Sequence, residues 1–116
     1  CRQFEDVIAQ CCYSVDIHEP NSDKTILIKL PEGQHYDIPL RCLVPHRGPG
    51  NLIVAGRSIS ATQTAMSSFR VSPSVMAIGE ATGVAAALAA ENESPVSAIP
   101  AKAVQDVLIR SNAILS

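Results

Sequence analysis

An apolar stretch of small residues in the second half of the chain constrains the fold more than any other feature. Residues 75–90 carry one charge, Glu80, and most of the other side chains are Ala, Gly or Val. Ser72 and Pro73 before it are residue types that begin helices, whereas Asn92 and Pro95 end them. The pattern predicts a helix with Ser72 as its cap and Pro73 as its first residue, which runs to about Glu91, and Glu80 favours a buried helix over a membrane span.

Small residues recur along this helix at every fourth position, at Gly79, Gly83 and Ala87. One side of the helix therefore carries a stripe with almost no side chain. Such a stripe is typical of a helix packed tightly on a sheet, and also of a helix whose backbone contacts a ligand. The spacing leaves both interpretations open.

Two segments near the amino terminus alternate polar and apolar residues in the manner of strands, over residues 13–18 and 25–30. Residues 19–23 between them have the composition of a turn, so a β-hairpin is predicted. A third strand is predicted over residues 36–44, where Pro39 requires an edge or a bulge.

A fourth strand is predicted over residues 51–56, because this nearly continuous apolar run is typical of a strand covered on both faces. Residues 57–72 are rich in Ser, Thr, Ala and Gln without clear periodicity, and we expect them to form an ordered lining. A second helix should begin near Pro100. The chain is therefore expected to be α+β, with about four strands and two carboxy-terminal helices.

Composition excludes several classes of function. The chain has 116 residues, which is room for one domain, and its net charge of −2 argues against binding to nucleic acid. Aromatic residues make up 3%, too few for a base-stacking surface. Four cysteines at positions 1, 11, 12 and 42 match no metal or redox spacing, so free thiols are expected.

Charge is distributed unevenly along the chain. Residues 1–37 hold seven acidic and three basic residues, whereas residues 38–79 hold no acidic residue and four arginines. A segment of this kind could fold around an anionic or electron-rich ligand, or could form a solvated basic face. The arginines are Arg41, Arg47, Arg57 and Arg70.

The order of elements around the long helix also points to a ligand. A strand ending in Gly56, then a Ser- and Thr-rich turn, then a helix amino terminus can bring backbone N–H groups close to a flat or phosphorylated molecule. We expect these to be the unpaired N–H groups of Ser74 and Val75 at the start of the helix, joined by that of Met76 if the helix begins later.

The run NLIVAGRSISATQTAMSSFRVSPSVMAIGEATGVAAALAA, residues 51–90, resembles the carboxy-terminal signature of a family of FAD-dependent oxidoreductases. The matching motifs are AGR at the strand end, ISAT in the turn, RV-x-P and the Gly- and Ala-rich helix, with support from VDIHEP and YDIPLRCLVP. The resemblance implies FAD as cofactor and a glutathione-reductase-type, α/β parent fold. Residues 1–45 would end a substrate-side sheet, and residues 46–116 would form the carboxy-terminal part of the FAD-binding domain.

The resemblance also implies roles for single residues. Gly56 and Arg57 would approach the ribityl chain of FAD, and Arg70 would stabilise negative charge on the reduced flavin. His18 is the best candidate for a role on the substrate side. The N–H groups facing the N1–C2=O edge of the flavin would belong to Ser74, Val75 and Met76.

The chain departs from the family pattern in two respects. Gln63 stands where a His is common, which puts acid or base chemistry at this position in doubt, and no G-x-G-x-x-G fingerprint occurs. The half of the site that binds ADP is therefore expected from a missing amino-terminal segment or from another chain.

The expected function is part of a flavoprotein oxidoreductase acting on an unknown small-molecule substrate, without nucleic acid or membrane partners and inactive alone. The alternative is a non-catalytic interaction or assembly module that docks through the Gly/Ala helix.

Overall fold

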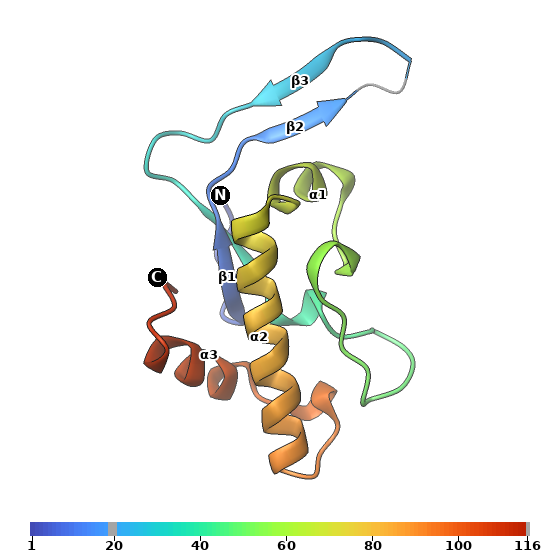
Figure 1. Cartoon of the computed structure of the whole chain (residues 1–116), viewed down its shortest axis with the longest axis vertical. Coiled ribbons are helices and arrows are strands. Elements are labelled where there is room, and N and C mark those ends of the chain that lie inside the picture. The colour runs from blue at the N-terminus through green and yellow to red at the C-terminus, as the bar shows by residue number, and fades with distance from the viewer. Residues whose placement is uncertain (19–20, 116) are drawn as a thin grey trace.

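The structure is a computed structural model, and it describes residues 1–18 and 21–115. The chain contains two small antiparallel sheets of two strands each. In the first, β1 (Val7–Cys11) pairs with β4 (Tyr36–Pro39). In the second, β2 (Val15–His18) pairs with β3 (Thr25–Ile28), which confirms the predicted hairpin. This hairpin projects from the rest of the molecule at the top of Figure 1.

The described residues form three α-helices, of which two pack against β1 and the shortest packs against β2. They are α1 (Gln63–Phe69), α2 (Ser72–Glu91) and α3 (Ala101–Arg110). The long helix α2 runs past β1, and α3 lies beside the lower half of α2 in Figure 1. Both predicted helices are confirmed, but the expected Ser72 cap is wrong, because Ser72 is already helical, Val71 is the N-cap and no side chain caps α2. Pro73 lies in the first turn, where its missing N–H costs no hydrogen bond.

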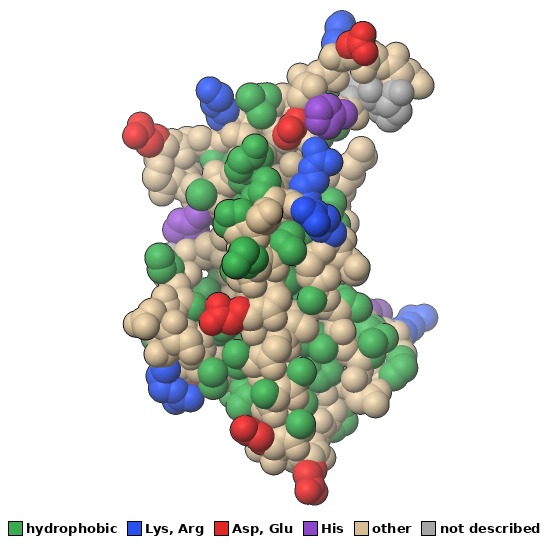
Figure 2. Space-filling view, viewed as in Figure 1, with side chains coloured by type: hydrophobic (Ala, Val, Ile, Leu, Met, Phe, Trp, Pro, Cys, Tyr) green, Lys and Arg blue, Asp and Glu red, His purple; other side chains and the backbone are tan. Residues whose placement is uncertain are grey.

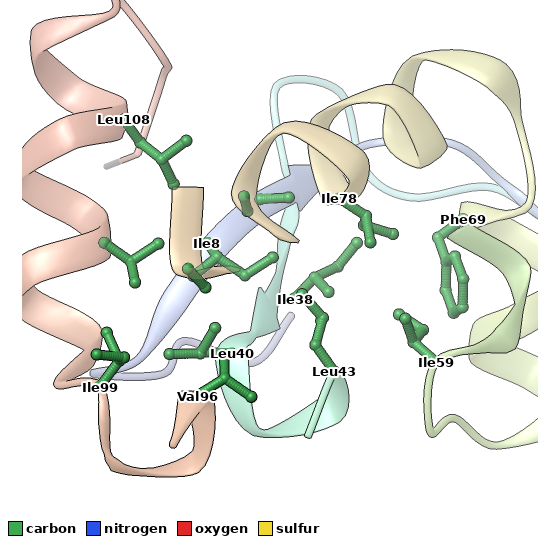
Figure 3. Close-up of a cluster of buried hydrophobic side chains, with 14 of the residues drawn as sticks. Ile8, Ile38, Leu40, Leu43, Ile59, Phe69, Ile78, Val96, Ile99 and Leu108 are labelled. Carbon is green, nitrogen blue, oxygen red and sulfur yellow. The ribbon is translucent and has the colours of Figure 1, made fainter. Parts of the chain in front are cut away.

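The hydrophobic core lies between the β1–β4 sheet, α2 and α3. Ile8 and Ile38 from the sheet meet Ile78 from α2 and Leu108 from α3, and all four side chains are almost completely buried (Figure 3). Burying a side chain of this size stabilises the fold by about 1.5–3 kcal/mol. Because the sheet and α3 cover only one face of α2, its opposite face remains exposed.

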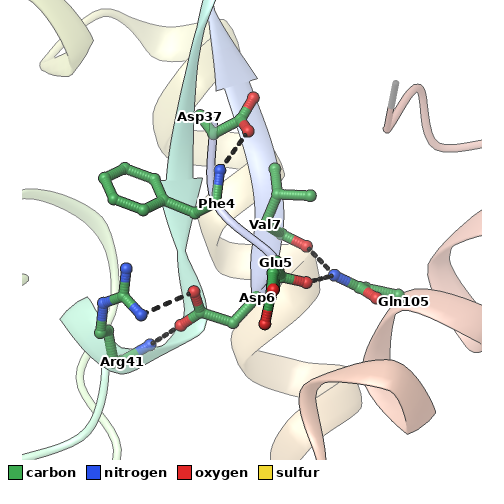
Figure 4. Close-up of polar contacts among 7 residues, drawn as sticks. All are labelled: Phe4, Glu5, Asp6, Val7, Asp37, Arg41 and Gln105. Carbon is green, nitrogen blue, oxygen red and sulfur yellow. Dashed lines mark hydrogen bonds and ion pairs between the residues drawn. The ribbon is translucent and has the colours of Figure 1, made fainter. Parts of the chain in front are cut away.

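Polar contacts fasten the amino-terminal segment to this core. The buried Asp37 carboxylate accepts hydrogen bonds from the Phe4 N–H at 2.9 Å and from Gln10 Nε2 at 3.2 Å. Gln105 on α3 donates Nε2 to the carbonyl oxygens of Glu5 and Val7 at 2.8 and 3.0 Å (Figure 4). The segment before β1 is thus held from β4 on one side and from α3 on the other.

Two elements that the composition did not predict are β1 and α1. Helix α1 begins at Gln63, directly after its cap Thr62, whose side chain accepts a hydrogen bond from the Ala65 N–H at 3.2 Å. Residues 57–72, expected to be a lining, therefore hold a short helix, and the α+β chain has three α-helices in place of two.

The predicted strand over residues 51–56 is wrong for this chain. The Val54 N–H donates to Leu43 O at 2.8 Å, but no strand among the described residues pairs with this segment. Leu52 remains 45% exposed. A strand requires a ladder of hydrogen bonds with a neighbour, and the chain as described offers none here.

The third predicted strand is shorter than expected. It ends at Pro39, and the chain continues as a 3-10 turn over Leu40–Cys42. Pro39 has no N–H to continue the ladder, which accounts for the early end.

The small-residue stripe of α2 does not pack on the sheet. A Cβ atom built on Gly79 or Gly83 would meet nothing within 4 Å, and both residues are exposed. The buried face of the helix is a different one, formed by Ile78, Ala81 and Ala85. Packing of the stripe against this chain's own sheet is therefore wrong, because the apolar side chains of α2 direct the opposite face inward.

By length and composition, α2 also passes the test for a membrane-spanning helix, as core helices of soluble proteins commonly do. Its Ile78 and Ala81 lie in the core described above. All four cysteines carry free thiols.

Candidate functional site

The site lies at the corner where α1 ends and α2 begins. Arg70 closes α1, and Val71, in an extended conformation, leads directly into Ser72 at the start of α2. A turn of two residues therefore places the last carbonyl groups of one helix beside the first N–H groups of the next. Two of the predicted site residues, Arg70 and Ser74, lie within one turn of this corner.

Gly56 and Arg57 are brought to the same corner by a short 3-10 turn, Gly56–Ser58. Gly56 has a φ of +64°, which residues other than glycine rarely adopt. A Cβ here would lie 3.6 Å from Val75 Cγ1, an ordinary van der Waals contact. The backbone conformation therefore favours glycine, and the turn packs against α2 near Val75.

The two arginines are linked through the backbone. Arg57 donates its Nε to the carbonyl oxygen of Arg70 at 3.0 Å, and Arg70 donates Nη2 to the carbonyl oxygen of Asp16 in β2 at 3.2 Å. No carboxylate in the described part of the chain lies within ion-pair distance of either guanidinium. Figure 2 shows Lys or Arg side chains next to each other below the hairpin.

The start of α2 adds to this positive potential. The helix has 20 residues and no acidic residue in its first turn, so the partial positive charge of its amino terminus has no compensating side chain there. Ser74 is buried, and the Met76 side chain is 73% exposed. The Val75 N–H donates to Val71 O at 3.1 Å, so the expectation that this group is unpaired is wrong.

On the hairpin side, β2 places Asp16 and His18 next to the arginines. The Asp16 Oδ1 atom is buried and has no hydrogen-bond partner among the described residues, and His18 Nε2 lies 3.6 Å from it. His18 Nδ1 lies 3.2 Å from Thr25 Oγ1 on β3, and its side chain is largely exposed. Asp16 was missed from the sequence, although its alternation with His18 in β2 puts both side chains on one face.

A buried hydroxyl network lies directly behind the corner. Tyr36 on β4 donates its hydroxyl to Ser68 Oγ at 2.8 Å, and Ser68 donates to the carbonyl oxygen of Tyr13 at 2.6 Å. Burial is the largest cause that raises the pKa of Tyr36 well above its ordinary value, so its hydroxyl stays protonated and remains a donor. This network was also missed, because nothing in the sequence relates positions so far apart.

Gln63 and a pocket near the carboxy-terminal tail lie apart from these hydrogen bonds. Gln63 is the exposed first residue of α1, and it takes no part in the hydrogen bonds of the two arginines described above. The pocket, of about 710 Å³, lies between β1, residues 30–35 and the carboxy-terminal tail, and none of the predicted site residues lines it. We place the candidate site at Arg57 and Arg70 because neither guanidinium has an ion-pair partner among the described residues.

A family model described as FAD dependent oxidoreductase matches residues 1–108. Neither the comparison with curated proteins nor that with solved structures found a match.

Proposed function

Because this chain belongs to the family of FAD-dependent oxidoreductases, with FAD as its cofactor, we propose that the corner between α1 and α2 forms the flavin-edge part of the FAD site. FAD supplies the electron-accepting and electron-donating chemistry when bound. The residues of this chain would bind and orient the flavin, and would stabilise the negative charge that it gains on reduction.

The observation that carries this proposal is positive charge without a partner. Arg57 and Arg70 have no carboxylate partner among the described residues, and the amino terminus of α2 adds positive potential to theirs. A flavin gathers negative charge at its N1–C2=O edge when reduced, and positive groups preorganised there favour reduction. Arg57 is exposed, but Arg70 is partly buried, and a partly buried guanidinium is costly without an anionic neighbour, which a bound flavin or an anionic substrate would provide.

We also propose where the half that binds ADP docks. The exposed face of α2 carries Met76, Gly79 and Gly83, and residues 52–55, which belong to no helix or strand, have no strand partner in the described chain. Bare backbone permits close approach of a neighbouring element, and a segment outside any ladder can pair with a neighbouring strand. The half that carries the dinucleotide fingerprint, from the same protein or from another chain, would occupy both surfaces.

On the other side of the corner, the hairpin would extend a substrate-side sheet, as proposed for residues 1–45. Every residue of β3 is exposed, including the apolar Ile26, Leu27 and Ile28. An apolar strand with an open edge is typical of a sheet continued by further strands. His18 at the end of β2 would then face the substrate.

The test is to purify the complete protein that carries this chain, and to identify any flavin released on denaturation. We expect FAD in a ratio near one to one with the protein. A preparation that contains no flavin and takes none up when FAD is added would contradict the proposal.

One observation favours a second function. Gly79 and Gly83 are open to solvent, as a docking surface for a partner chain requires. In that case the protein would be a non-catalytic interaction or assembly module. Association that is lost on Gly79→Leu in a protein without flavin would support this alternative over the first.

A further inference from the structure

We infer that Ser68 is a positioning residue of the flavin-edge site, and that its buried hydroxyl fixes where Arg70 meets the hairpin. The inference rests on the function proposed above, because it assigns to Ser68 the alignment of groups that this function requires. Ser68 itself touches neither arginine, and it acts through the helix that carries Arg70.

The first step concerns the hydrogen bonds of Ser68. Its side chain is fully buried, accepts from the Tyr36 hydroxyl at 2.8 Å and donates its only proton to Tyr13 O at 2.6 Å. Cys11 Sγ lies 3.7 Å from Ser68 Oγ. The direction of the network is therefore fixed, from Tyr36 through Ser68 to the carbonyl group at the base of the hairpin.

The second step concerns how the Tyr13 carbonyl group joins α1 to the hairpin. Ser68 and Arg70 lie two residues apart in the last turn of α1, and each donates to a backbone carbonyl of the same passing segment, at Tyr13 and Asp16. The two bonds clamp the end of α1 to the beginning of β2. The carbonyl oxygen of Arg70 in turn accepts from Arg57 Nε, so both arginines depend on the position of this turn.

The neighbouring Ser67 provides a matched control. It is also buried, but its hydroxyl donates to Thr64 O within the same helix, at 2.8 Å. Replacing either serine by alanine removes one buried hydroxyl of the same size from the same turn. Only the change at Ser68 releases the helix from the hairpin.

The experiment uses the complete flavoprotein with bound FAD, and sulfite as an anionic probe that adds reversibly to the flavin and bleaches its visible absorbance. Positive charge near the N1–C2=O edge tightens sulfite binding, so the dissociation constant reports the placement of Arg70 without any substrate. We expect Ser68→Ala to weaken sulfite binding by about tenfold, a modest value for a displaced charged group, and to lower the flavin reduction potential. Ser67→Ala should leave both quantities unchanged.

Sulfite affinity and potential in Ser68→Ala that equal those of Ser67→Ala would overturn the inference. If Ser68→Ala does not fold, Tyr36→Phe carries the test, because it keeps the ring and removes the donor to Ser68; a change in the same direction is expected, and wild-type values would overturn the inference. Arg70→Met separates the two levels. If it changes sulfite binding and Ser68→Ala does not, the positioning role alone fails, whereas no change in either variant contradicts the proposed site itself.

Discussion

Arg70 is the residue on which the electrostatic argument depends. It spends one hydrogen bond on Asp16 O and has no ion-pair partner in the described chain. Replacement by Met keeps much of the side chain's length and removes the charge. In the complete protein we expect Arg70→Met to lower the flavin reduction potential, or to raise KM for an acidic substrate.

Potentiometry and steady-state kinetics check this prediction, with Arg110→Met as the control, because Arg110 is an exposed residue at the far end of α3. If potential and KM both stay at wild-type values in Arg70→Met, Arg70 is a surface charge and does not serve the flavin.

Gln105 decides how firmly α3 is held. Its buried amide donates to two carbonyl groups, so Gln105→Leu leaves Glu5 O and Val7 O without this donor. We expect the free energy of unfolding to fall by about 1–3 kcal/mol. Thermal unfolding of the complete protein measures the change, and Lys102→Ala, which removes an exposed ion pair to Asp106, should cost about 0.5 kcal/mol or less. If Gln105→Leu and Lys102→Ala lower the free energy of unfolding equally, the hydrogen bonds of the Gln105 side-chain amide contribute little.

At the scale of elements, α2 shows how much could be predicted. Its start at Ser72 and Pro73 and its end near Asn92 followed from the residue types at its two ends, although Ser72 makes no capping hydrogen bond. The hairpin followed from alternation. The helix face directed to the core did not follow, because Ala and Gly on every side leave no apolar stripe to choose between.

The elements that were missed lack local signals. In α1 only Thr62 at the cap and a few apolar residues mark seven helical positions, and β1 is a five-residue run without alternation. The strand expected over residues 51–56 failed for the opposite reason. Its composition fits a buried parallel strand, but such a strand forms only beside a neighbour that this chain, where described, does not provide. The clustering of Asp16, Arg57 and Arg70 depends on tertiary structure and could not be read from spacing.

Substitutions at Gly79 in the exposed stripe of α2 should have effects that depend on the size of the new side chain and on whether the half that binds ADP is present. Nothing in this chain fills the space beside Gly79, so Gly79→Ala and Gly79→Leu should both be tolerated in the chain alone, and Ala should favour the helix. If the half that binds ADP docks here, Gly79→Leu in the complete protein should cost about 1–3 kcal/mol by overpacking and lower the FAD content. Wild-type FAD content in the Leu variant would show that the stripe is not a contact face.

For the whole molecule, the proposal that this chain holds one side of the FAD site predicts weak binding by the chain alone. The 116 residues offer positive groups for the flavin edge but no dinucleotide fingerprint for the pyrophosphate. Fluorescence titration of the isolated chain with FAD should show weak or no binding. Tight binding in a one-to-one ratio would mean that the pyrophosphate is held by residues in this chain.

The contact between Gln105 and Glu5 spans 100 positions, and it has a consequence for the order of folding. Within this chain β1 is made before α3, so the side of the sheet that meets Val104 and Leu108 stays uncovered until residues 101–110 have been made. Closing so long a loop is slow relative to local helix formation. A nascent chain stopped before Ala101 would therefore lack the cover that α3 gives to Ile8 and its neighbours, and would expose them to proteases and chaperones.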